Sequence, residues 1–180
     1  WGWAGTVADF LQTPSPKWLE ALSLHHLALL NMAPSASQVD AWVESEQVLR
    51  STLRDVCVSN PEAVNWGLVF EYELLLEGGR RPDVVVLTGG AVVVLEFKQN
   101  PTNSQAAVDQ VEAYARDLAE YHSESHNRVC PPIVVLPRAQ FPSRIEQTEI
   151  SDRASLAKML IERVRPGQID VHDWVQGHYE

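Results

Sequence analysis

The stretch that most constrains the fold runs from residue 83 to residue 98 and reads DVVVLTGGAVVVLEFK. Two runs of valine and leucine flank Gly89-Gly90, a pair that favours the tight turn of a β-hairpin. Nearly continuous apolar and β-branched residues are typical of strands that are covered on both faces. We therefore expect this hairpin to lie inside a sheet with further layers on both sides.

The segments around the hairpin supply those layers. A helical period of apolar residues predicts helices at 6–13, 15–31, 35–56, 103–122, 152–164 and 170–177. A period of two predicts a half-buried strand over 67–79, and a short apolar run predicts a buried strand at 131–137. The order of helices, three strands, a helix, a strand and helices predicts an α/β sandwich with a central mixed sheet.

Length, charge and cysteine content narrow the class of protein. The 180 residues fit one domain with a full core, and no apolar run approaches the roughly 18–20 residues of a membrane span. No signal-peptide pattern opens the chain, and Cys57 and Cys130 stand in no CxxC motif, which favours reduced thiols and a cytoplasmic location. The formal net charge of −10 repels polyanions at long range. Any contact with nucleic acid must therefore be local, metal-assisted or helped by a neighbouring domain.

Charged residues stand at both ends of the otherwise apolar segment 83–98. Antiparallel pairing around the glycine turn brings Asp83, at the start of one strand, beside Glu96, at the end of the other. Alternation places Glu96 and Lys98 on one face and turns Phe97 to the other. Two carboxylates beside a lysine suit a hard cation such as Mg²⁺, which lowers the pKa of a bound water and stabilises charge on a phosphoryl oxygen. The pattern predicts metal-assisted hydrolysis of a phosphodiester bond.

The letters PD at residues 82–83, followed by EFK at residues 96–98, resemble the motif of the PD-(D/E)XK nuclease superfamily. A bare motif of this kind occurs by chance in many chains, but here its acids fall at the facing ends of a predicted hairpin. The preceding GGRR also supplies the glycine-led turn that such nucleases place before the aspartate. The resemblance implies a restriction-endonuclease-like three-layer sandwich, with a mixed β-sheet between helices. We expect one domain over 1–180, with N-terminal helices in 1–60 and the catalytic core in 66–137.

The resemblance also implies roles for individual residues. Asp83 and Glu96 bind the metal, which is Mg²⁺ or Mn²⁺, and the backbone carbonyl of Phe97 can join them. Lys98 assists the nucleophile.

A third metal-binding acid has two candidates. The superfamily often takes such an acid from its first core helix, which implies Glu46, on the apolar face of the predicted helix 35–56. A carboxylate there needs a partner, and Arg50 is the alternative to a metal. Glu71 is the rival candidate, on the polar face of the strand beside the hairpin, where simple exposure to solvent is the alternative. The sequence does not choose between the two acids.

Two further motifs bear on the substrate. Gln110 and Tyr114 lie four residues apart on one helical face and match the QxxxY motif of RecB-like nucleases, in which they line the substrate side. The alternative is a tyrosine at the edge of the core beside a surface glutamine. Arg80 and Arg81 directly precede the PD pair and can hold a phosphate, with a surface ion pair to Glu77 as the alternative.

Over a wider range, the chain contains TVADFL, the predicted helix with Trp42, FEYEL followed by RRPDVVVL, VLEFK, DQVEAYARDLAEYH and the closing DWVQGHYE. Together these segments look like the nuclease-like module that precedes a superfamily-1, Schlafen-related helicase domain in bacterial proteins. The likeness implies the front part of a nuclease–helicase whose motor lies beyond Glu180, since the sequence has no GxxxxGK[ST] motif. We expect a nuclease that acts on DNA, in antiphage defence or in DNA processing with a helicase. The alternative is a nuclease-fold module that docks nucleic acid or protein without cutting, which the acidic charge favours and the intact acid–acid–lysine set disfavours.

Overall fold

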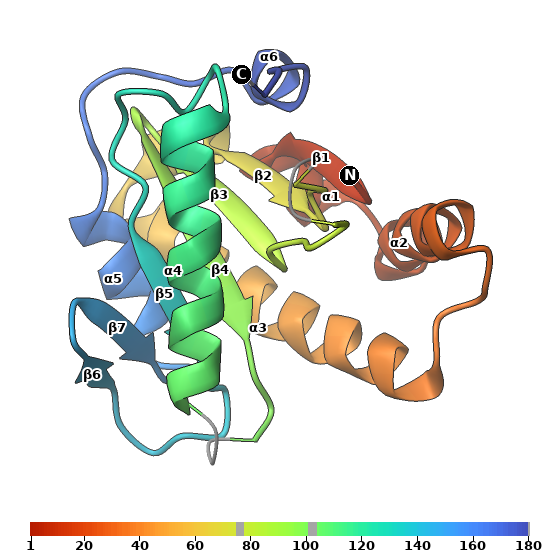
Figure 1. Cartoon of the computed structure of the whole chain (residues 1–180). Coiled ribbons are helices and arrows are strands. Elements are labelled where there is room, and N and C mark those ends of the chain that lie inside the picture. The colour runs from red at the N-terminus through yellow and green to blue at the C-terminus, as the bar shows by residue number, and fades with distance from the viewer. Residues whose placement is uncertain (75–77, 101–103, 180) are drawn as a thin grey trace.

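The computed structural model describes residues 1–74, 78–100 and 104–179 and centres on one mixed β-sheet (Figure 1). The described part of this sheet has seven strands in the order β1-β2-β3-β4-β5-β7-β6. The strands are β1 (Trp3–Thr6), β2 (Gly67–Phe70), β3 (Val84–Thr88), β4 (Ala91–Phe97), β5 (Pro132–Val135), β6 (Ser143–Ile145) and β7 (Thr148–Ser151). The predicted α/β class with a central mixed sheet is confirmed.

Helices cover both faces of the sheet, and α4 crosses one face while α3 and α5 lie on the other (Figure 1). The described helices are α1 (Val7–Gln12), α2 (Ser15–Leu30), α3 (Ala36–Ser59), α4 (Ser104–Tyr121), α5 (Leu156–Glu162) and α6 (Val171–Val175), with a 3₁₀ helix, η1, at Pro61–Asn65. Within the described ranges, these helices lack the combination of length and apolar character that a membrane crossing needs.

The central hairpin of β3 and β4 forms as predicted, with Val84 opposite Leu95 and a turn at Gly89, whose φ is +68°. Val84 and Leu95 contribute to the core cluster beneath α3. Val85 points the other way, into the core cluster beneath α4. Because both faces of the hairpin are buried, its valine runs need no polar alternation.

The direction of the strands decides what can meet at one edge of the sheet. Strands β4, β5 and β7 run parallel to one another, and β3 runs antiparallel to both β2 and β4. Strands β2, β4, β5 and β7 therefore all end at the same edge, where β3 begins. We call this side of the molecule the carboxyl edge. In open α/β sheets, ligands bind outside the carboxyl ends of the strands.

The structure differs from the sequence-based prediction in its number of strands. Strands β1, β6 and β7 were not predicted, because each has only three or four residues and pairs with a partner that its own sequence does not specify. The strand predicted over 67–79 ends early, at Phe70. Glu71 has a φ of +55°, which interrupts the extended backbone there, and residues 75–77 of the prediction lie outside the described ranges.

Candidate active site

The carboxyl edge brings the two hairpin acids and the lysine together. Asp83 precedes β3 and Glu96 lies near the end of β4, next to the Val84–Leu95 pair. The backbone N–H of Phe97 donates a hydrogen bond of 2.7 Å to Oδ2 of Asp83, and this bond ties the aspartate to the neighbouring strand. Lys98 Nζ lies 2.8 Å from Oε1 of Glu96. The register thus places all three predicted site residues at one end of one hairpin.

Glu96 is buried and Asp83 is half-buried, and their charges are not fully compensated. Burial raises the pKa of Asp83 well above its usual value, and the nearby Glu96 carboxylate raises it further. Burial also raises the pKa of Glu96, although Lys98 opposes that rise. The Oε2 atom of Glu96 is buried and has no hydrogen-bond partner. Two carboxylates share one lysine here, so the site favours the approach of a further positive charge.

Lys98 stays protonated at this site. Burial by itself lowers the pKa of its ammonium, but the charges of Glu96 and Asp83 outweigh that effect and hold the pKa above its ordinary value. The side chain is 40% exposed, in contrast to the buried glutamate that it contacts. A lysine in this state donates hydrogen bonds and positive charge, and it is a poor general base.

The donor set fits a small hard cation. In the described part of the chain, no three His, Cys, Asp or Glu side chains form a ready-made metal cage. Mg²⁺ does not require one, because it keeps several waters and is commonly bound through one or two carboxylates. Asp83 and Glu96, with the unpartnered Oε2 atom, supply oxygen ligands of that kind.

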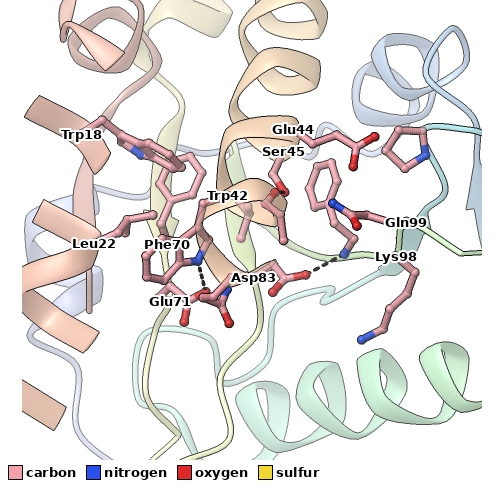
Figure 2. A pocket seen from close by; sticks show the side chains of 15 residues that line it. Trp18, Leu22, Trp42, Glu44, Ser45, Phe70, Glu71, Asp83, Lys98 and Gln99 are labelled. Carbon is pink, nitrogen blue, oxygen red and sulfur yellow. Dashed lines mark hydrogen bonds between the residues drawn. The ribbon is translucent and has the colours of Figure 1, made fainter. Parts of the chain in front are cut away.

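A pocket of about 200 Å³ opens beside these residues, between α2, α3 and the carboxyl edge (Figure 2). Asp83 lies at its centre, with Glu71 and Trp42 on one side and Gln99 on the other. The side chain of Lys98 extends from the pocket wall toward α4. Glu96 does not line this pocket, so the pocket opens on the Asp83 side of the site, while the lysine borders α4.

The two candidates for a third acid have different surroundings. Glu71 lines the pocket with Asp83, and its charge raises the pKa of both Asp83 and Glu96. Its Oε1 accepts a 3.0 Å hydrogen bond from Nε1 of Trp42, and its Oε2 lies 3.0 Å from Nε of Arg81. The positive φ of Glu71 costs about 1–3 kcal/mol in a residue other than glycine, and such strain clusters at functional sites. Glu71 is within electrostatic reach of the hairpin acids.

Glu46 lies elsewhere. Its Oε1 is 2.8 Å from Nε of Arg50, one helical turn further along α3. The same guanidinium donates to the carbonyl oxygens of Phe10 and Thr13, which belong to the N-terminal part of the chain. Glu46 is absent from the pocket lining and faces this arginine.

The predicted substrate residues fall partly at the site. Nε2 of Gln110 donates a 2.7 Å hydrogen bond to the hydroxyl of Tyr114, so the two act as one unit on α4. Burial raises the pKa of Tyr114, and the charges of Glu96 and Asp83 add to that rise, so the tyrosine lies within electrostatic reach of the acids. Arg81 forms an ion pair with Glu71 and does not itself line the pocket.

Trp42 is a site residue that the sequence did not reveal. Its position on the apolar face of α3 indicates a core residue, and it is indeed buried. Its indole N–H nevertheless fixes the carboxylate of Glu71 (Figure 2). The sequence offers one general indication of such a role, because a buried tryptophan usually donates its N–H to a partner. The sequence pattern does not say which acceptor that is.

Comparison of the chain with protein-family models, with curated proteins and with solved structures gives no match. The functional assignment must therefore come from the residues of this chain and their geometry.

Proposed function

We propose that this chain is a metal-dependent nuclease, and that Asp83, Glu96 and Lys98 at the carboxyl edge hydrolyse a phosphodiester bond. The main support is the pair of carboxylates, one buried and one half-buried, that shares one lysine and leaves Oε2 of Glu96 without a partner. Such an arrangement destabilises the fold and is typical of a site with a chemical task.

Each of these residues would have a separate role in hydrolysis. Asp83 and Glu96 would hold Mg²⁺ or Mn²⁺, with the backbone carbonyl of Phe97 as a further oxygen ligand. The bound ion lowers the pKa of a water and stabilises negative charge on the phosphoryl group. Lys98, which is protonated, orients the attacking water and stabilises the charge that develops in the transition state.

Neighbouring residues shape the site and complete its electrostatics. Glu71 is held by Trp42 and Arg81 and is the preferred third acid, because its charge already acts on both hairpin acids. Gln110 and Tyr114 line the substrate side from α4. This proposal includes a restriction-endonuclease-like fold, DNA as the substrate, and a place in a larger nuclease–helicase that serves antiphage defence or DNA processing. The motifs quoted above support each of these.

The test is single-turnover cleavage of single-stranded DNA, duplex DNA and RNA, with and without Mg²⁺ or Mn²⁺. Lys98→Ala should lower the cleavage rate about 10²-fold or more, the effect of losing one transition-state contact, while the protein stays folded. Lys158→Ala is the matched control, because this exposed lysine on α5 has only a long contact, 3.8 Å, with Glu162. A Lys98→Ala protein that cuts at the wild-type rate would show that the assignment is wrong.

A docking module with a nuclease fold is the second candidate. The formal net charge of −10 favours it, because such a chain repels nucleic acid at long range. Wild-type protein that binds DNA or a protein partner but cuts nothing with either metal, even when joined to its downstream region, would establish this alternative.

A further inference from the structure

A row of basic side chains follows the parallel strands at the carboxyl edge. Lys98 comes directly after β4, Arg138 comes three residues after β5, and Arg153 comes two residues after β7. These strands are consecutive neighbours in the sheet. Since neighbouring strands lie about 4.8 Å apart, the row extends roughly 10 Å outward from the active site. The chain has 14 Lys and Arg against 24 acids, so three cations at consecutive strand ends depart from its overall charge.

The two arginines line a hollow that adjoins the active-site pocket. Arg138 and Arg153 share this hollow, about 390 Å³ in volume, with Gln47, Glu44 and Gln99. The last two of these residues also line the active-site pocket, so the two spaces have a common wall. Figure 2 shows Glu44 and Gln99 at that wall, on the side of the pocket away from α2. A chain that occupies the active site can therefore continue into the hollow.

Both arginines are available to a ligand. Arg138 is 64% exposed, and its Nε lies 3.4 Å from Oε1 of Glu44. An exposed ion pair of this kind contributes little to stability, so a phosphate can replace it with two parallel N–H···O bonds. Arg153 is exposed and its side chain forms no ion pair or hydrogen bond with the described residues. By contrast, Arg81 and Arg50 are each held by a buried glutamate.

The hollow also has an acidic part. Asp40 and Glu44 belong to α3 and line the hollow, and Glu44 is the acid that contacts Arg138. A phosphate group is repelled by these carboxylates and attracted by the guanidinium groups. It is therefore directed to the side formed by the segments after β5 and β7.

We propose that Arg138 and Arg153 bind the phosphodiester backbone of the substrate next to the scissile bond. This assignment presupposes the nuclease activity proposed above and adds the path by which the substrate strand leaves the active site. The two arginines recognise phosphate, not base, so the contact is independent of nucleotide sequence.

Binding without cleavage tests this site. The probe is a fluorescently labelled DNA oligonucleotide, single-stranded or duplex, titrated into Asp83→Asn protein while its anisotropy is measured. Combined replacement of Arg138 and Arg153 by alanine should weaken binding roughly tenfold or more, because charge-assisted hydrogen bonds are lost. The slope of log K against log salt should fall by about one for each phosphate contact removed.

Arg116→Ala is the matched control. This arginine on α4 is 62% exposed, and its one ion pair within the described residues is a long contact, 3.8 Å, with Asp117, so its loss should leave DNA affinity and salt slope unchanged. Unchanged affinity and slope in the double arginine variant would overturn the phosphate site, and the nuclease proposal would stand if Lys98→Ala still loses cleavage. A wild-type protein that never cuts, but binds DNA through these arginines, would support the site and overturn the nuclease.

Discussion

Two buried glutamates show how differently this chain treats a carboxylate in its interior. Glu46 on α3 and Glu96 on β4 are 4% and 3% exposed. Glu46 contacts Arg50, whose guanidinium also donates to two carbonyl oxygens and lies 4.4 Å from the centre of the Phe10 ring. The charge of Glu46 is thus matched by a cation whose own N–H groups are bonded.

Glu96 has a different environment. Its cation, Lys98, is 40% exposed and also interacts with a second, half-buried acid, Asp83. One oxygen of Glu96 has no partner, and the pKa values of both acids are raised. Glu46 and Glu96 are therefore equally buried but differ in how fully their charges are compensated. A carboxylate whose charge is compensated stabilises the contact between two parts of the fold. An uncompensated pair of carboxylates can instead bind a ligand that carries positive charge.

The largest expected effect comes from breaking the compensated pair. Arg50→Ala leaves Glu46 buried with no cation and also removes the hydrogen bonds to Phe10 and Thr13. We expect the free energy of unfolding to fall by about 3–5 kcal/mol, the usual result of removing one partner of a buried ion pair. Urea denaturation measures this change, with Arg116→Ala as an exposed control. A loss below about 1 kcal/mol would mean that the pair contributes little to the fold.

A buried histidine sharpens the comparison, because it avoids the cost of burial by staying neutral. His122 is fully buried, and its Nδ1 lies 3.0 Å from the hydroxyl of Ser125, which in turn accepts a hydrogen bond from the indole of Trp174. Burial lowers the pKa of His122 to about 4, whereas an unfolded histidine titrates near 6.5. The unfolded chain therefore binds a proton first as the pH falls.

Stability from His122 is fully present above about pH 6.5 and is lost as the pH falls toward 4. The loss approaches about 3 kcal/mol, from 1.36 kcal/mol for each pKa unit. Urea denaturation between pH 7 and pH 4 measures it as the difference between wild type and His122→Gln, in which other titrating groups cancel. Equal pH dependence in the two proteins would contradict the buried neutral histidine.

Particular residues show how far the sequence could go. The paired hairpin, its burial on both faces and the meeting of Asp83 with Glu96 follow from period-two alternation around a glycine turn, which is local information. The sequence predicts a strand that is longer than β2, because no neighbouring residue indicates the left-handed backbone of Glu71. The sequence also does not decide whether Glu46 or Glu71 is the third acid of the site. Glu71 is held by Trp42, which lies 29 residues away, and such long-range contacts leave no periodic signal.

The central claim is that Asp83 and Glu96 form an incompletely compensated pair of acids that binds a cation. Thermal melting with Mn²⁺ tests this claim most directly. Without metal, Asp83→Asn should be more stable than wild type by about 0.5–2 kcal/mol, because the substitution removes the repulsion from Glu96 that raises the pKa of Asp83. Saturating Mn²⁺ should raise the melting temperature of wild type and of Glu46→Gln, but not that of Asp83→Asn. Equal Mn²⁺ shifts in wild type and Asp83→Asn, or no shift in either, would contradict the account.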